Sequence, residues 1–358
     1  MRTLIIAEAG VNHNGNESLA FKLVDAAYEA GADIVKFQTF KASKLVTANA
    51  KQAVYQIKNT QKEESQLAML SRLELSFEVH IELIKYCNKL GIEFLSTAFD
   101  SDSLKFLVNE LKLKKLKIPS GDLTNAPLLL EHAQTGCDLI VSTGMATLAE
   151  IETALGVIAF GYTAKSKDKP GRQAFEKAYI SELGQKKLKE KVTVLHCTTE
   201  YPAPVEDINL NAMDTIANAF KLNIGYSDHS TGIYIPVAAV ARGATTIEKH
   251  FTLDKDMEGP DHKASLEPEE LKNMIGAIRK IELALGDGIK GPRPSEIKNK
   301  YVGRKSLVAS KQIGIGDVLC DENIDIKRPG NGMNPIHYWE LLNKASTKSY
   351  EVGDLIFE

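Results

Sequence analysis

Two histidines, His229 and His250, each follow a short apolar run and stand beside acidic residues. Their positions differ by 21 residues, which is enough for one helix and the strand after it. If both runs are neighbouring parallel strands, the imidazoles face the same edge and can share one divalent ion. Two ligands are few for zinc, so the pattern favours Mn²⁺ or Mg²⁺ completed by water and substrate. The spacing fits equally well with two histidines that are simply packed in the core.

Two lysines, Lys36 and Lys117, lie inside apolar runs and therefore need partners, because an unpaired buried ammonium is costly. Hydroxyl side chains stand at the ends of other apolar runs, namely Thr97, Ser120, Ser142 and Ser227. Such a ring of cations and hydroxyls suits the phosphate or carboxylate of a small anionic substrate. Two alternatives remain open. The lysines could pair with Glu8, Asp122 or Asp228, or one of them could form a Schiff base, as in aldolases.

The order of the elements indicates a scaffold that would bring these residues together. Apolar runs rich in Ile, Val and Leu alternate with amphipathic stretches. The runs cover residues 3–10, 33–40, 93–99, 115–121, 139–144, 192–202, 223–230 and 245–252. Eight strands alternating with helices predict an α/β fold, a (β/α)8 TIM barrel with its site at the carboxyl ends of the strands. A doubly wound sheet is the weaker alternative, since "AGVNHNGN" after the first run lacks GxGxxG spacing.

We expect three parts along the chain. They are a catalytic barrel over residues 1–286, a linker over 287–304 that is rich in Gly, Pro and charge, and a small β-rich domain over 305–358. Gly316-Asp317 and Gly353-Asp354 mark two similar turns in the last part, which suggests internal pseudo-repetition. About 55 residues make a marginal core, so this domain is expected to pack on its own barrel or on a partner's.

Two segments exceed what a barrel needs. Residues 41–75 form a long excursion after the second run. Residues 159–191 are basic, polar and in part helical in pattern, and we interpret them as a solvated surface insertion.

The composition indicates which kinds of binding partner and which cellular compartment to expect. With 43% hydrophobic and 25% charged residues and a net charge of −3, the chain offers no reason to expect a nucleic acid or membrane partner. The apolar run in "MRTLIIAEAG" is shorter than a signal peptide requires, and no run approaches 18 apolar residues, so we expect neither a signal peptide nor a membrane span. The four cysteines are far apart and form no CxxC, so we expect reduced thiols in a cytoplasmic protein.

Nine motifs resemble, in chain order, those of the sialic acid synthase family. They are "AEAGVNHNGN", "VKFQTFKA", "FLSTAFD", "KIPSGD", "STGMAT", "HCTTEYPAP", "YSDHSTG", "EKHFTLDKDMEGPDHKASLEP" and "KRPGNGM". This resemblance implies a (β/α)8 barrel followed by an antifreeze-like (SAF) domain. It also implies a domain-swapped homodimer, in which each small domain covers the mouth of the partner's barrel.

The resemblance further implies a transferase that forms a C–C bond from phosphoenolpyruvate. The family condenses phosphoenolpyruvate with an open-chain N-acetylmannosamine-type sugar to give a nine-carbon 2-keto acid and phosphate. The acceptor is N-acetylmannosamine in some members and 2,4-diacetamido-2,4,6-trideoxymannose, which gives legionaminic acid, in others. "HCTTEYPAP" and the N-terminal stretch lean towards the legionaminic type. The implied cofactor is a divalent metal, Mn²⁺ first, with Mg²⁺ or Co²⁺ as alternatives.

The resemblance also suggests a role for individual residues. It makes His229 and His250 metal ligands and Glu8 the acid that orients a water molecule. The implied phosphoenolpyruvate contacts are Lys36, Thr97, Lys117, Ser120, Ser142, Thr199 and Ser227. Thr198 and Thr199 occupy a stretch where some members have an asparagine. The implied sugar contacts are Gln38, Asn59, Asp122, Tyr201, Asp261 and, from the partner's small domain, Arg328.

The segment 245–265 holds further polar residues that we assign no chemistry. We interpret Glu248 and Lys249 as structural, and we expect His262 not to be a ligand. On the family reaction the lysines act electrostatically, which weighs against the Schiff-base aldolase. A carbohydrate-binding protein with a degenerate barrel is a third reading, and the intact set of Glu8, both histidines and both lysines argues against it.

Overall fold

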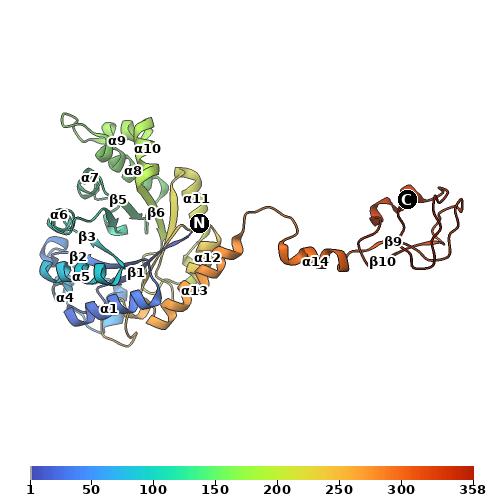
Figure 1. The fold of residues 1–358 in the computed structure, drawn as a ribbon. Coiled ribbons are helices and arrows are strands. Elements are labelled where there is room, and N and C mark those ends of the chain that lie inside the picture. The colour runs from blue at the N-terminus through green and yellow to red at the C-terminus, as the bar shows by residue number, and fades with distance from the viewer. Residues whose placement is uncertain (1) are drawn as a thin grey trace. The chain divides into compact units, whose positions relative to one another are not determined.

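A computed structural model of the chain describes residues 2–358. It divides into two compact units, one ending at Gly286 and the other running from Asp287 to Glu358 (Figure 1). Within residues 2–358, no helix is both long and apolar enough to cross a bilayer.

The first unit is a closed barrel of eight parallel strands, each hydrogen-bonded to the next along the chain, with β8 closing on β1. The strands are β1 (Leu4–Gly10), β2 (Ile34–Thr39), β3 (Glu93–Ala98), β4 (Lys115–Ile118), β5 (Asp138–Ser142), β6 (Val192–Cys197), β7 (Asn223–Asp228) and β8 (Thr246–His250). This confirms the predicted (β/α)8 barrel, and the doubly wound alternative is wrong.

Helices surround the strands (Figure 1). The principal ones are α1 (Glu17–Ala30), α5 (Phe77–Leu90), α6 (Ser101–Asn109), α7 (Ala126–Gln134), α8 (Leu148–Thr163), α11 (Asn211–Phe220), α12 (Tyr234–Ala241) and α13 (Pro268–Leu285). The strands are apolar on both faces because their outer faces pack on these helices, while their inner faces fill the barrel.

The strand period of two connects this inner core to the site. Inside the barrel, one side chain each from β1, β2, β3, β5 and β6 forms an apolar cluster, made of Ile6, Ile34, Leu95, Ile140 and Leu195. The residue two positions further along each strand points to the same side. These next inward residues are Glu8, Lys36, Thr97, Ser142 and Cys197. The apolar layer therefore lies directly beneath the polar residues at the mouth of the barrel.

Both long excursions are largely helical. The segment after β2 contains α2 (Ala42–Leu45), α3 (Val54–Thr60) and α4 (Gln66–Leu73). The segment 159–191 consists of the end of α8, then α9 (Arg172–Ile180) and α10 (Glu182–Lys191). Phe160 and Phe175 pack edge to face with ring centres 5.3 Å apart, so α9 is anchored on α8 rather than solvated on all sides.

The second unit carries a small antiparallel pair, β9 (Ser306–Ala309) with β10 (Ile324–Lys327), as expected for a β-rich domain. A short helix, α15 (Tyr338–Leu341), follows. The two predicted turns are alike, because Asp317 Oδ2 accepts from Gly314 N at 2.6 Å and Asp354 Oδ2 accepts from Glu351 N at 2.8 Å.

The predicted linker contains a helix, α14 (Pro294–Gly303). Its start is favourable despite the Gly and Pro content, since proline is tolerated at the first helical position. Glu296 Oε2 also accepts from Arg293 N at 2.9 Å, which satisfies one free donor at the helix start.

Candidate active site

A cavity of about 500 Å³ opens at the carboxyl ends of the barrel strands. It brings together most of the residues singled out in the sequence. Those that line it are Glu8, Lys36, Gln38, Thr97, Lys117, Ser120, Asp122, Ser142, Thr199, Tyr201, Ser227, His229, His250 and Asp261. Two are not among the lining residues, Asn59 and Arg328.

An ionic cluster crosses the cavity floor. Lys36 Nζ contacts Glu8 Oε2, lies 3.5 Å from Glu248 Oε2 and donates to Thr97 Oγ1 at 2.9 Å. Lys117 Nζ lies 3.2 Å from the other oxygen of Glu248. All four charged side chains are at most 5% exposed. Each buried lysine thus has an acidic partner, as the cost of burying an ammonium requires.

The main partner is a residue whose role sequence reasoning missed. Glu248, interpreted above as structural, lines the cavity and joins both lysines, and Ser227 Oγ donates to its Oε1 at 2.8 Å. The signal was available in the strand period, because Glu248 lies two positions before His250 and so shares its face. Of the three acids named as partners, only Glu8 pairs with a cavity lysine, since Asp228 binds Lys249 and Asp122 lies near Asn125.

Burial and charge set the protonation of this cluster. Burial raises the pKa of Glu8 to about 7, against the pull of the Lys36 ammonium. Burial alone would lower the pKa of Lys36, but Glu248 and Glu8 more than offset it, so the pKa is raised. Burial also acts to raise the pKa of Glu248, yet Lys117 and Lys36 leave it lowered. At neutral pH the cavity floor therefore holds a charged Lys36 and an ionised Glu248, whereas Glu8 has a pKa of about 7.

The two histidines lie on adjacent strand ends, with ring centres 5.5 Å apart. Burial lowers the pKa of His229 to about 4 and holds that of His250 well below its usual value, so both rings are neutral. His229 Nδ1 donates to Thr198 O at 2.6 Å, which leaves Nε2 with a free lone pair. His250 Nδ1 is buried without a hydrogen-bond partner in the protein.

The two histidines fit a divalent ion only if water and substrate supply its other ligands. Within residues 2–358, no group of three or more His, Cys, Asp or Glu side chains is arranged to hold a metal. Two neutral imidazoles are present, one oriented through a backbone carbonyl as metal-binding histidines are. They fit an ion whose remaining ligands are water and substrate oxygens, not a fully enclosed protein site.

Hydroxyl groups form a second part of the cavity. Ser142 Oγ and Thr199 Oγ1 are buried and have no partner in the protein. Ser120 Oγ accepts from Gly144 N at 2.9 Å. A methyl group at Gly144 would clash with Thr199 Oγ1 and would lie 2.9 Å from Ser120 Oγ. Gly144 thus allows Thr199 and Ser120 to lie close to the backbone. The unpaired hydroxyls of Ser142 and Thr199 line the cavity, where an anion would pair with them.

The candidate sugar contacts differ from one another. Asp261 is buried, and burial raises the pKa of its carboxyl to about 7. Tyr201 packs on His229 with ring centres 4.1 Å apart. Asn59 instead braces two loops, because its Nδ2 donates to Tyr201 O at 3.2 Å and to Pro260 O at 2.7 Å. Arg328 lies in the second unit, where its Nε donates to Gly303 O at 3.0 Å.

The loop after β8 is fixed by its own polar contacts. His262 is fully buried, with Nδ1 2.7 Å from Thr252 Oγ1 and Nε2 3.2 Å from Asn14 Oδ1. Both ring nitrogens of His262 thus lie within hydrogen-bond distance of side chains of the protein. Asn14 Nδ2 also donates to Glu258 O at 2.9 Å, so the loops after β1 and β8 hold each other in place.

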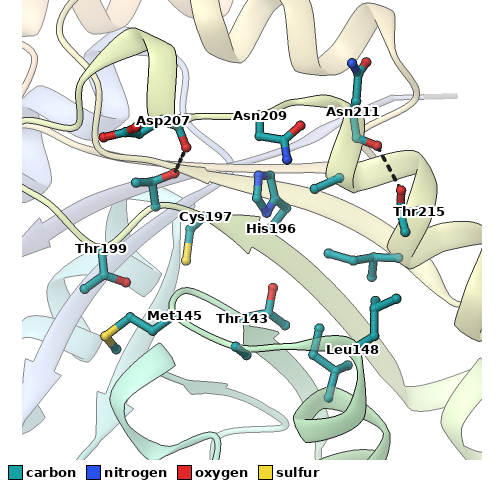
Figure 2. A pocket seen from close by; sticks show the side chains of 15 residues that line it. Thr143, Met145, Leu148, His196, Cys197, Thr199, Asp207, Asn209, Asn211 and Thr215 are labelled. Atoms are coloured by element: carbon teal, nitrogen blue, oxygen red, sulfur yellow. Dashed lines mark hydrogen bonds between the residues drawn. The ribbon is translucent and has the colours of Figure 1, made fainter.

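A second cavity of about 610 Å³ lies beside the first, between the loops after β5 and β6 and helices α8 and α11. Figure 2 shows Met145 and Leu148 along one side of it and Asn209 and Asn211 along the other. His196 lines this second cavity, and its Nε2 donates to Ile208 O at 2.7 Å. The second cavity is lined by no residue of the ionic cluster and by neither His229 nor His250, so we place the chemistry in the first cavity.

A closed parallel barrel with a cationic, hydroxyl-lined mouth defines a (β/α)8 barrel enzyme. The model of the NeuB family matches residues 23–290, and the chain belongs to that family. It is 51% identical over 357 residues to N,N'-diacetyllegionaminic acid synthase of Campylobacter jejuni, covering 100% of this chain and 99% of the relative. It is 44% identical over 353 residues to the enzyme of that name from Legionella pneumophila, covering 99% and 93%.

A solved structure agrees with this assignment. The N-acetylneuraminic acid synthetase of Leptospira borgpetersenii, crystallised with citrate, is 32% identical and has a TM-score of 0.67. The similarity covers 84% of this chain and 90% of that one. The predicted membership of the sialic acid synthase family is therefore confirmed.

Proposed function

We propose that this protein condenses phosphoenolpyruvate with an open-chain N-acetylated hexosamine and releases inorganic phosphate. The product is a nine-carbon 2-keto acid of the N,N'-diacetyllegionaminate type, in line with the names of the two relatives described above. The single observation that carries the proposal is the buried floor in which Lys36, Lys117 and the unpaired hydroxyls converge on one cavity.

Phosphoenolpyruvate carries a carboxylate and a phosphate, and the cavity offers donors for both. The two ammonium groups are held by carboxylates, and Lys36 also donates to Thr97 Oγ1. The hydroxyls of Ser142 and Thr199 are buried and have no partner in the protein. Preorganised donors stabilise charge without reorganisation during the reaction. Glu248 contacts both lysines and holds them in position. Their buried ammonium groups therefore have a carboxylate partner even when no anion is bound.

The reaction forms one C–C bond and breaks one C–O bond. The electrons of the C2=C3 bond of phosphoenolpyruvate attack the aldehyde carbon of the sugar, and the aldehyde oxygen takes a proton to become a hydroxyl. Water then adds to the electron-deficient C2 and gives up a proton. Phosphate then leaves C2 with the bridging oxygen as this C–O bond breaks, and the C2 hydroxyl gives its proton to the departing phosphate, which leaves the 2-keto acid. Glu8, whose pKa is near 7, is the residue that orients this water and accepts its proton.

We further propose that His229 and His250 hold a divalent metal, Mn²⁺ first, with Mg²⁺ or Co²⁺ as alternatives. Such an ion would polarise the aldehyde oxygen as a Lewis acid. The support is the pair of neutral, buried imidazoles on adjacent strands.

A Schiff-base aldolase is disfavoured by the setting of Lys36. A Schiff base needs a neutral amine, and carboxylates on either side of this ammonium raise its pKa.

Three features belong to the proposal through the family resemblance. They are an SAF-type second domain over residues 305–358, a domain-swapped homodimer, and a contact from Arg328 of one subunit to the sugar bound by the other. We also propose a cytoplasmic location, supported by four cysteines that are all free and of which three are buried.

The test is a synthesis with phosphoenolpyruvate labelled with ¹⁸O at the bridging C2 oxygen, Mn²⁺ and the acceptor sugar. The proposal expects the label in released phosphate, because the C–O bond breaks. Glu8→Gln is expected to lower kcat by about 10² or more, the usual range for loss of a general base. Label retained in the organic product, or condensation of pyruvate without phosphate release, would contradict the proposal.

A further inference from the structure

The excursion after β2 places a tyrosine, Tyr55, in the wall of the active cavity. This residue lies near the start of α3, is half-buried and lines the cavity together with Tyr201 from the loop after β6. The barrel itself has no need of residues 41–75, so the contacts that Tyr55 makes indicate what this segment adds to the site.

The ring of Tyr201 connects α3 to the two histidines. It stacks on Tyr55, with ring centres 5.0 Å apart and 28° between the ring planes. It also packs on His229, with centres 4.1 Å apart and 33° between the planes. Towards His250 it is edge-on, at 5.6 Å and 86°. A series of aromatic contacts therefore runs from the excursion to the imidazoles at the ends of β7 and β8.

The backbone of Tyr201 is held from the same helix. Asn59 follows Tyr55 by four residues and so lies on the same face of α3. Its Nδ2 donates to Tyr201 O at 3.2 Å and to Pro260 O at 2.7 Å. These hydrogen bonds fix the backbone of Tyr201 but leave its side chain free to change rotamer. On the side of α3, the stack with Tyr55 is the contact that restrains the ring.

The loop after β6 also determines how His229 is oriented. His229 Nδ1 donates to Thr198 O at 2.6 Å, and the ring of Tyr201, three residues further along, packs on the imidazole. The lysine floor is independent of this loop, because the ion pairs that hold it are formed by residues of the barrel strands alone. A change at Tyr55 should therefore reach His229 and leave the floor intact.

We propose that Tyr55 is a positioning residue, which holds the ring of Tyr201 against His229 and thereby shapes the acceptor side of the cavity. This inference rests on the proposed function, in which phosphoenolpyruvate occupies the lysine floor and the sugar takes the remaining space. Tyr55 acts through Tyr201, so its ring is required and its hydroxyl is not. The excursion thus contributes to acceptor binding by fixing a loop of the barrel.

Three replacements at this position separate the ring from the hydroxyl. Tyr55→Phe retains the stack, whereas Tyr55→Leu and Tyr55→Gln remove it with an apolar and a polar side chain. Phosphate release is followed in the full-length protein with Mn²⁺, phosphoenolpyruvate and 2,4-diacetamido-2,4,6-trideoxymannose. The Leu and Gln variants should lose about 10- to 100-fold in kcat/KM for the sugar, mainly through KM, with KM for phosphoenolpyruvate nearly unchanged. The Phe variant should match the unmodified protein.

A second measurement does not depend on turnover. In protein with ¹³C-labelled histidine, the carbon-bound protons of His229 are shielded by the Tyr201 ring, and His229→Gln identifies their signal. Without metal or substrate, Tyr55→Leu and Tyr55→Gln should move this signal downfield, and Tyr55→Phe should leave it in place. Val54→Ala is the matched control, because Val54 adjoins Tyr55 on α3, is 84% exposed and is not among the lining residues. It should change neither measurement.

The outcomes separate this inference from the proposed function. An unchanged KM for the sugar, or an unchanged His229 signal, in the folded Leu and Gln variants overturns the inference and leaves the proposed function standing. Equal losses in Tyr55→Phe and Tyr55→Leu would place the effect in the hydroxyl and overturn it too. Unfolding of both non-aromatic variants, or a rise in KM for both substrates, would show a general structural role and have the same consequence.

Failure of the proposed function would look different. If the unmodified protein releases no phosphate that depends on the sugar, the proposed function is overturned, and with it the role of Tyr55 in acceptor binding. The His229 signal would then still report whether Tyr55 holds Tyr201 in place.

Discussion

Asp228 and Lys249 form a fully buried ion pair between β7 and β8, with Lys249 Nζ 2.6 Å from Asp228 Oδ2. Each stands next to one of the two histidines, but on the outer side of its strand. The same lysine donates to Ser230 O, and Ser230 Oγ donates to Asp228 Oδ1 at 2.8 Å. This pair joins β7 and β8 where their backbones are also paired, on the opposite side of the strands from the imidazoles.

Breaking this pair is predicted to destabilise the barrel strongly. Lys249→Met should lower the free energy of unfolding by about 3–5 kcal/mol, because it leaves the Asp228 carboxylate buried and unpaired. Replacing both partners by apolar residues, as in Asp228→Leu with Lys249→Met, should cost less than the single change. Urea unfolding measures both. Glu82→Gln, which removes an exposed partner of Lys85, is the control and should change little.

Asp261 is predicted to make stability depend on pH in the acid range. Burial raises its pKa from the ordinary 3.8 to about 7, so the folded protein retains a proton that the unfolded chain has lost. The contribution of Asp261 to stability is therefore complete below about pH 4 and decreases as the pH rises to 7, by at most about 1.4 kcal/mol per unit.

Asp261→Asn should remove this component. The free energy of unfolding of the variant relative to the unmodified protein should rise between pH 4 and pH 7 and then level off. The exposed Asp256→Asn is the control and should follow the unmodified protein. A difference between the Asp261 variant and the unmodified protein that does not change with pH would refute the prediction.

Removal of metal is predicted to abolish activity reversibly. Excess EDTA should stop phosphate release and added Mn²⁺ should restore it. In His229→Ala the binding of Mn²⁺, read from the electron paramagnetic resonance signal of the free ion, should weaken by about tenfold or more, while the thermal unfolding of the metal-free protein changes little. Full activity in excess EDTA would be incompatible with the metal proposal.

Gly144→Ala is predicted to damage the anion pocket. The added methyl group would clash with Thr199 Oγ1 and crowd Ser120 Oγ and Cys197 Sγ, so those hydroxyls must shift. We expect KM for phosphoenolpyruvate to rise by about 10- to 100-fold, in the range of a one-ångström misplacement. Gly276→Ala is the matched control, because a methyl group there meets nothing within 4 Å. An unchanged KM in the Gly144 variant would show that the hydroxyls do not bind this substrate.

Much of the fold and site could be predicted from the sequence, for identifiable reasons. Apolar runs alternating with amphipathic stretches indicate parallel strands covered on both faces by helices. The number of such runs, eight, then favours the barrel over a doubly wound sheet. The strand-end rule then places Glu8, Lys36, Lys117, His229 and His250 at one mouth. The position of both lysines within apolar runs also predicted that each is paired with an acidic residue, since a buried ammonium needs a carboxylate partner.

What the sequence left undecided depends on contacts between distant segments. The choice of Glu248 rather than Asp122 or Asp228 as the common partner of the lysines follows from which side chains share the inner face of the closed barrel. Asn59 braces loops 142 and 201 residues away instead of lining the cavity. The sequence likewise does not predict the apolar cluster beside the cavity, because Val11, Phe99 and side chains from the segment after β2 come together only after folding. Local periodicity determined the scaffold and the facing of each strand, whereas partner choice and cavity shape required the tertiary packing that brings these segments together.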